Sequence, residues 1–201
     1  AQMIQATKLY ESETGEDVSS FNTRLHPKDF LEQYFAPYMK VVGRCTNKAQ
    51  CYDNQTPLAI DRKTIAWPPQ YMLQLINGTY IGIIQVDAGT VFYIDINGSG
   101  KPNLSGRDIF YFYLVNVDTI GENEGCQGSL DIMKATLTSG LYPGSYDSCF
   151  TPHGTESRDR LLGLEAHRSC NRKATHLSMG DACAAVIMKD GWKISKDYPW
   201  N

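Results

Sequence analysis

A loop of closely spaced oxygen-bearing residues is the first candidate for chemistry in this sequence. The candidate ligands are Asp95, Asn97, Ser99, Asn103 and Asp108. Oxygen atoms at alternate positions match the opening of a calcium-binding loop, where they converge on the ion. The twelfth position, which should carry a carboxylate, is a glycine, and the next acid follows two residues later. Two interpretations stay open: a calcium site, and a tight structural loop whose Asp and Asn side chains cap backbone amides while glycines supply positive φ.

Six cysteines are the second chemical feature, and no two of them form a CxxC pair, which disfavours a structural zinc site. They are Cys45, Cys51, Cys126, Cys149, Cys170 and Cys183. Their even number and their polar, Gly-, Asn- and Ser-rich surroundings predict disulfides, and therefore an oxidising compartment. The sequence does not choose the connectivity. The most economical hypothesis pairs neighbours: Cys45–Cys51, Cys126–Cys149 and Cys170–Cys183.

Residues that could carry catalysis do not form a recognisable set. The four histidines are scattered, at His26, His153, His167 and His176, and none lies in an HExxH motif. GxSxG, P-loop and GxGxxG motifs are also absent from the sequence. A secreted hydrolase would have to rely on the last three histidines. We therefore expect no catalytic residues, and no enzyme.

The charge and hydrophobic content fit an ordinary globular chain. The net charge is −3, hydrophobic residues make up 42% of the 201 residues, and charged residues make up 20%. This balance provides enough apolar material for a core. It contains no strongly basic region, so we expect no nucleic-acid partner.

The elements that must position these residues begin with two helices. Rough 3.6-residue spacing predicts a helix over residues 1–13, which Thr14 and Gly15 end. A second helix is expected to follow His26, because Pro27 suits a first helical position and an apolar stripe follows it. Residues 1–42 are therefore predicted to form a helical N-terminal part.

Aromatic and β-branched runs then predict strands over residues 80–86, 90–96 and 109–117. The first two should form a hairpin, and all three a central sheet over residues 80–117. Residues 43–70, before it, are rich in loop signals. The order of helices before strands indicates an α+β fold with an antiparallel sheet.

The C-terminal part, residues 156–201, is expected to contain a short helix over 158–167. The apolar run 182–188 and residues 192–194 are predicted to be two strands of a hairpin, joined by a Lys-Asp-Gly turn. The whole of residues 1–201 is expected to be a single disulfide-stapled, loop-rich domain.

The N-terminus carries no signal peptide, and no run of 18 apolar residues occurs in the sequence. The chain opens directly on a helical pattern without a capping residue. We expect it to be a fragment whose helix continues upstream.

Two stretches resemble the heads of type IV pilins and type II secretion pseudopilins, which are made as prepilin-type precursors. Residues 93–114, YIDINGSGKPNLSGRDIFYFYL, look like a D-x-N-G…P-N…G-x-D-I-F pattern between two strands. Residues 183–200, CAAVIMKDGWKISKDYPW, resemble a frequent C-terminus of such subunits. The residues that fit this second pattern are Cys183, Gly191, Trp192, Tyr198, Pro199 and Trp200. Together the stretches cover about a fifth of the chain.

The resemblance implies a fold in which an N-terminal helix packs on an antiparallel sheet. It also implies that the last cysteine pair forms a C-terminal disulfide loop. The expected function is structural: a subunit of a type IV pilus (fimbria) or pseudopilus, made in the inner membrane through an apolar N-terminal helix and assembled at the cell surface. Its partners would be copies of itself or other pilins. The alternative is a secreted adhesin or ligand-binding module with a calcium-stabilised loop.

Overall fold

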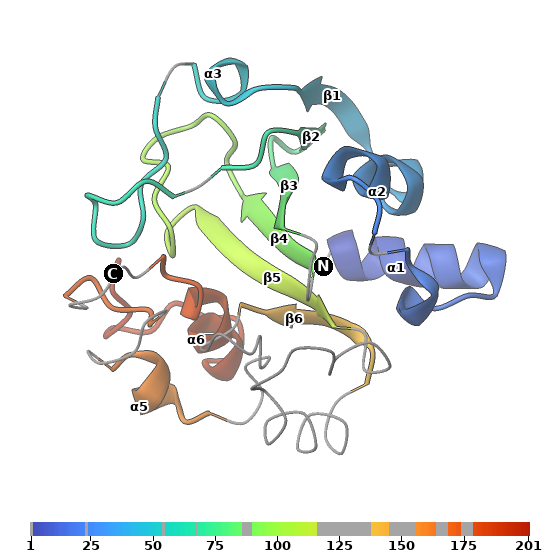
Figure 1. Ribbon diagram of the computed structural model, residues 1–201. Helices are drawn as coiled ribbons and strands as arrows, with labels where there is room; N and C mark the ends of the chain where they lie inside the picture. The colour runs from blue at the N-terminus through green and yellow to red at the C-terminus, as the bar shows by residue number, and fades with distance from the viewer. Residues whose placement is uncertain are drawn as a thin grey trace.

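The computed structural model describes residues 2–22, 24–53, 55–66, 68–85, 90–115, 138–144, 156–163, 169–173 and 179–201 (Figure 1). Over these residues the chain has an α+β fold built on a six-stranded antiparallel sheet. The strands lie side by side in chain order: β1 (Val41–Cys45), β2 (Met72–Leu75), β3 (Tyr80–Gln85), β4 (Thr90–Asp95), β5 (Ile109–Val115) and β6 (Gly140–Pro143).

The three strands predicted from aromatic and β-branched runs are β3, β4 and β5, so these predictions are confirmed. β3 and β4 form the expected hairpin, and β5 pairs with β4 along its length, with Tyr93 opposite Tyr111 and Phe92 opposite Phe112. The sheet is wider than the predicted 80–117 span, because β1, β2 and β6 add to both edges. β1 and β2 are short strands inside a region whose loop signals dominated.

The two faces of the sheet bury different side chains, as the two-residue period of a strand requires. One face carries mainly aliphatic residues and Phe92: Leu73, Leu75, Ile81, Ile83, Phe92 and Leu114. The opposite face carries most of the tyrosines: Met72, Tyr80, Val91, Tyr93, Ile109, Tyr111, Tyr113 and Val115. The sheet is therefore covered on both sides.

The predicted N-terminal helices are both present and cover the aliphatic face. α1 (Gln2–Thr14) buries Met3, Ala6 and Tyr10 in the same cluster as the strands. α1 ends at Gly15, which has φ +75° and donates its N–H to Glu11. α2 (Pro27–Tyr34) begins after His26, whose ring accepts a hydrogen bond from the Lys28 amide. Short 3-10 turns, η1 (Val18–Ser20) and η2 (Ala36–Tyr38), follow α1 and α2 respectively.

The tyrosine-rich face is closed by the segment after β1. α3 (Lys48–Cys51) brings Cys51 and Tyr52 into the cluster of this face, next to Cys45 at the end of β1. Cys45 and Cys51 are both buried and are free thiols. The structure thus does not contain the Cys45–Cys51 bond expected from the sequence, although burial and the neighbouring Cys45 raise the pKa of the Cys51 thiol.

The C-terminal part forms a third apolar cluster beside β5 and β6, where Figure 1 shows α5 (Arg158–Leu161) and α6 (Cys183–Lys189). Its buried members come from four segments of the chain: Ile60, Leu161, Cys170, Ala182, Cys183, Ala185, Val186 and Tyr198. The helix expected over 158–167 is observed as α5, and residues 164–168 lie outside the described part.

The predicted C-terminal hairpin is wrong, because residues 183–189 form helix α6. Two alanines at its start favour a helix, and its buried face packs on the third cluster. The glycine expected in a hairpin turn ends the helix instead: Gly191 has φ +70° and donates its N–H to Met188. Trp192 donates its own N–H to Ile187, which completes a Schellman motif.

Within the described residues, no helix combines the length and apolar character needed to cross a bilayer.

Candidate functional site

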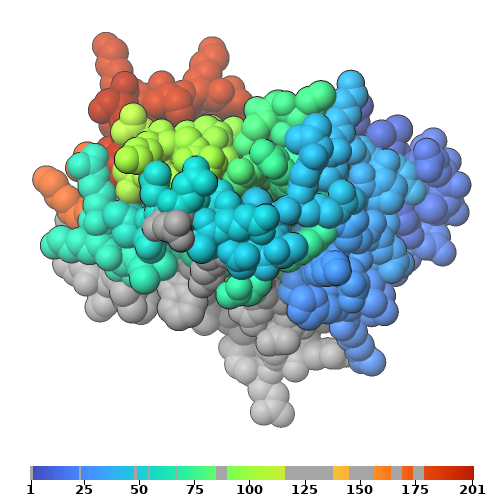
Figure 2. All heavy atoms as spheres, turned by 90° about the horizontal axis from the view of Figure 1, so that it is seen from above, coloured from blue at the N-terminus to red at the C-terminus, as the bar shows by residue number. Residues whose placement is uncertain are grey.

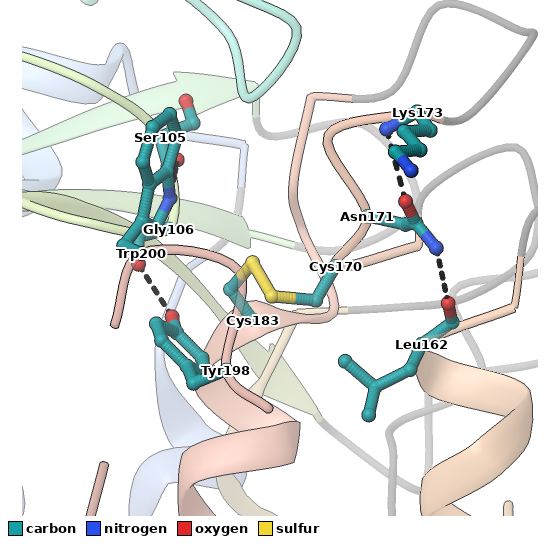
Figure 3. The surroundings of a disulfide bond; sticks show 9 residues. All are labelled: Ser105, Gly106, Leu162, Cys170, Asn171, Lys173, Cys183, Tyr198 and Trp200. Carbon is teal, nitrogen blue, oxygen red and sulfur yellow. Dashed lines mark hydrogen bonds between the residues drawn. A yellow bond between two sulfur atoms is a disulfide. The ribbon is translucent and has the colours of Figure 1, made fainter. Parts of the chain in front are cut away.

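The two stretches that carry the family resemblance meet in the structure. The indole Nε1 of Trp200 donates to the carbonyl of Ser105 over 3.1 Å, and the Tyr198 hydroxyl donates to the carbonyl of Gly106 (Figure 3). We call this contact, with the Cys170–Cys183 disulfide beside it, the C-terminal lock. It joins positions more than 90 residues apart in the sequence.

Gly106 is the point at which the lock leaves no room for a side chain. Its φ is +76°, which is unfavourable for residues other than glycine. A Cβ atom there would lie 2.5 Å from the Sγ of Cys183 and 3.2 Å from Nε1 of Trp200. The glycine therefore allows the loop before β5 to approach both the disulfide and the C-terminal segment.

The disulfide attaches the lock to the helices of the C-terminal part. Cys170 and Cys183 are bonded, one of the neighbour pairs expected from the sequence. The Cys170 amide donates to Leu161 over 2.8 Å, and the Asn171 side chain donates to Leu162 over 2.6 Å (Figure 3). These bonds hold the 170–173 segment against α5. The expected partners Cys126 and Cys149 lie outside the described residues.

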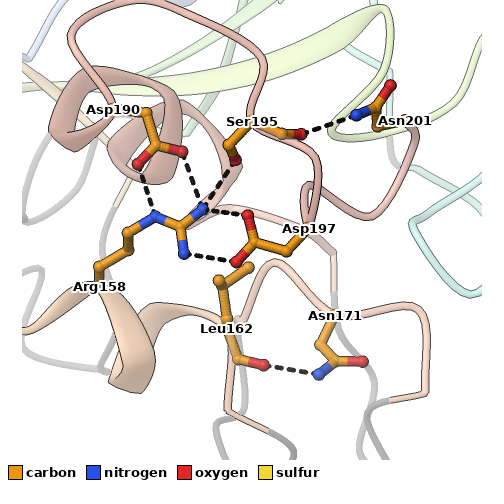
Figure 4. Close-up of polar contacts among 7 residues, drawn as sticks. All are labelled: Arg158, Leu162, Asn171, Asp190, Ser195, Asp197 and Asn201. Carbon is orange, nitrogen blue, oxygen red and sulfur yellow. Dashed lines mark hydrogen bonds and ion pairs between the residues drawn. The ribbon is translucent and has the colours of Figure 1, made fainter.

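Arg158 of α5 binds the segment that follows α6 (Figure 4). Its guanidinium contacts both carboxylate oxygens of Asp190 at 2.5 and 2.9 Å, and both of Asp197 at 2.7 Å. It also donates to the Ser195 hydroxyl over 2.7 Å. The arginine lowers the pKa of both carboxyl groups below their usual range. Such forked pairs fix geometry as well as charge, so Arg158 orients the residues leading to Tyr198 and Trp200.

The candidate calcium loop is held together by its own side chains. Asp95 is fully buried, and its carboxylate accepts from the Asn97 amide over 3.2 Å and from the Tyr52 hydroxyl over 3.1 Å. Asn103, at φ +52°, points its side-chain amide at the carbonyls of Gly98 (3.0 Å) and Gly100 (2.6 Å). These contacts are those of the structural interpretation, in which Asp and Asn side chains bond the backbone of the loop.

The remaining candidate ligands are only partly engaged. The Asn97 amide donates to the Lys101 carbonyl over 3.4 Å, and the half-buried Ser99 lies beside the Tyr80 hydroxyl. Asp108 is 6% exposed and accepts from the backbone around Leu104, while its Oδ2 has no hydrogen-bond partner among the described residues. No group of three or more His, Cys, Asp or Glu residues suited to a metal occurs in the part that the structure describes.

A buried polar network lies behind this loop, and sequence reasoning missed it. The Tyr52 hydroxyl bridges Tyr93, over 2.8 Å, and Asp95. Burial raises the pKa of Asp95 to about 7, and the nearby Asp108 raises it further. No spacing in the sequence pointed to Tyr52, because it reaches Asp95 from 43 residues away.

A surface pocket of about 650 Å³ lies beside the lock and was also missed. We call it the basic pocket, because Arg62, Arg172 and Lys173 line it. The guanidinium carbons of the two arginines lie 4.9 and 4.7 Å from the Trp200 ring centroid. The arginines and lysine come from separate loops, so no local motif marks the pocket. Of the histidines, His26 caps α2, and the other three lie outside the described residues.

Comparison with known proteins places the chain in one family. A family model described as a family of unknown function, DUF6613, matches residues 5–201, and the chain therefore belongs to this family. No curated protein matches the chain significantly. No solved structure matches it significantly either.

Proposed function

We propose that this member of a family without an assigned activity is the globular head of a filament subunit of the type IV pilin or type II secretion pseudopilin kind. Its role is structural, and no catalytic step is assigned to it. In this proposal an apolar N-terminal helix holds the precursor in the inner membrane, and the head is displayed outside the cell after assembly. The partners are other copies of the chain or other pilins.

The observation that carries the proposal is the C-terminal lock. The resemblance rests on residues 93–114 and 183–200, and Gly106 of the first stretch packs against Cys183 and Trp200 of the second. A pattern of matching letters has no reason to coincide with one contact, unless these residues serve the same structural purpose. The resemblance therefore concerns a three-dimensional unit, which ties the end of the chain to the sheet beside a disulfide.

The packing of α1 gives further support. Met3, Ala6 and Tyr10 lie in one apolar cluster with the sheet, whereas Ile4 is 46% exposed and Leu9 is 40% exposed. A helix that is buried on one side and keeps apolar side chains on its flanks can contact a second apolar surface. In a filament that surface would be provided by neighbouring subunits.

Cell fractionation tests the proposal. The chain, joined behind a prepilin-type apolar segment, is produced in a bacterium with a pilus assembly system. We expect the unassembled subunit in the inner membrane and the processed subunit in the fraction that mechanical shearing releases from cells. A subunit that is processed but stays soluble and monomeric would count against the proposal. The same segment fused to an unrelated secreted domain is the control for retention caused by the segment alone.

A secreted ligand-binding module remains the second candidate, and the buried Oδ2 of Asp108 favours it. A calcium ion near this oxygen and Asp95 would offset the repulsion between the two carboxylates. Thermal unfolding with added calcium and with a chelator separates the candidates. A melting temperature that depends on calcium, and that loses this dependence in Asp108→Asn, would favour the module.

A further inference from the structure

We propose that the basic pocket of one copy of this chain binds the acidic end of α1 in the next copy. The acidic segment, residues 11–17, contains Glu11, Glu13, Glu16 and Asp17. This inference rests on the proposed filament function, since it names the contact between neighbouring heads. Its three parts are the charge of the pocket, the charge and rigidity of the acidic segment, and the position of both on the molecule.

The basic pocket keeps its positive charge because its own acids are already bonded. Asp197 is held by Arg158 at 2.7 Å, and Asp61 accepts from the backbone and hydroxyl of Thr64 and from the Lys63 amide at 2.7–2.9 Å. By contrast, Arg62, Arg172 and Lys173 form no ion pair with any acid in the described residues. All three are exposed. A cluster of unpaired cations in a hollow favours an anionic partner.

Arg62 occupies a position that is costly for an arginine. Its φ is +63°, in the left-handed region where glycine or asparagine is usual. This backbone conformation costs about 1–2 kcal/mol for a residue with a Cβ. The guanidinium is also held over the Trp200 ring, 4.9 Å from its centroid. An arginine kept in a strained turn, with its charge held at the pocket, is consistent with a role for that charge in binding.

The acidic segment is fixed in place by its own hydrogen bonds. Glu16 accepts from the Tyr10 hydroxyl over 2.9 Å, and Asp17 accepts from the Ser19 amide over 2.7 Å. Between them, Gly15 turns the chain away from α1. Glu13, Glu16 and Asp17 are exposed. A carboxylate cluster on a rigid turn loses little conformational entropy on binding.

The two charged features lie at opposite ends of the molecule. In Figure 1 the C-terminal part and the chain end lie on the left, and the end of α1 that leads into η1 lies on the far right. Figure 2, viewed from above, again places the C-terminal residues and the N-terminal helix on opposite sides. Complementary surfaces at opposite ends cannot form a closed symmetric dimer with each other. They form a head-to-tail contact, which propagates into an open filament.

Charge reversal in separate variants tests the contact. The pocket variant is Arg62→Glu with Arg172→Glu, and the segment variant is Glu11→Lys with Glu13→Lys. Neither variant should self-associate, because each presents two surfaces of like charge. A mixture of the two should associate, because opposite charges again face each other. Lys40→Glu with Lys101→Glu, an equal charge change at exposed positions outside both surfaces, is the matched control.

The measurement is sedimentation of the full 201-residue chain at low salt, together with carbodiimide cross-linking and identification of the joined peptides. We expect association of the native chain to weaken by roughly tenfold or more in each variant and to return in the mixture. Cross-links should join Lys173 to the acidic segment of another copy. Equal association in all variants, or an equal loss in the control, would overturn the inference. Filaments assembled normally from the pocket variant would also overturn it, while leaving the proposed filament function intact.

Discussion

At the scale of single residues, Gly106 determines how closely the end of the chain approaches the sheet. We expect Gly106→Ala to lower the free energy of unfolding by about 2–4 kcal/mol, through the positive φ and through the clash with Cys183 and Trp200. The matched control is Gly191→Ala, where φ is +70° but no atom lies within 4 Å of the new Cβ. This control should lose only about 1 kcal/mol. Urea unfolding of both variants measures the difference, and equal losses would show that the close packing at Gly106 has no energetic weight.

Asp95 should make stability depend on pH. Its pKa is raised to about 7 by burial, from an ordinary value of about 4. Between these values the folded state retains a proton that the unfolded state has released, so the free energy of unfolding falls as pH rises. The acids with lowered pKa, such as Asp190 and Asp197, act in the opposite direction but at lower pH.

Denaturant unfolding over this pH range checks the expectation. The native chain should lose stability from about pH 5 to about pH 7, and Asp95→Asn should flatten the profile. Asn keeps a side-chain oxygen for the Tyr52 hydroxyl but does not titrate in this range. A variant profile with the native slope would assign the dependence to other groups.

At the scale of elements, Arg158 joins α5 to the residues that follow α6. Arg158→Met should speed amide hydrogen exchange over residues 190–201, because Asp190 and Asp197 lose their shared partner. Arg158→Lys is the control, since it keeps the charge but cannot form the two forked pairs. We expect an intermediate exchange rate for lysine. Unchanged exchange in the methionine variant would show that the lock holds without the arginine.

The elements also show how far the sequence could predict this fold. The long signals were sufficient: both N-terminal helices and strands β3 to β5 formed where periodicity and capping residues indicated. The run 182–188 was ambiguous, because a short apolar segment can be a buried strand or a buried helix. Its alanines and the glycine at position 191 decided for a helix, which packs on a cluster assembled from distant segments.

The candidate site was less accessible from the sequence. Both stretches of the lock could be recognised by their resemblance, but their mutual contact depends on tertiary packing across more than 90 residues. The same holds for Tyr52, which reaches Asp95 from another loop, and for the basic pocket, whose cations come from separate segments. Local spacing carries no record of such contacts.

At the scale of the whole molecule, the structure combines a rigid sheet core with charged features at its two ends. α1 and α2 cover one face of the sheet, while the C-terminal lock closes the region beside β5. The acidic segment and the basic pocket then lie on opposite sides (Figures 1 and 2). Such a molecule is suited to repeated head-to-tail contacts, and a polar association of this kind should weaken as salt concentration rises.

Electron microscopy with antibodies against the head tests the central proposal most directly. Cells that produce the subunit behind its apolar N-terminal segment should display surface filaments labelled along their length, and cells without the assembly system should display none. Labelled filaments with these properties are the predicted result. A stable, processed head that is secreted as a free monomer, with no labelled filament on any cell, would contradict the proposed function.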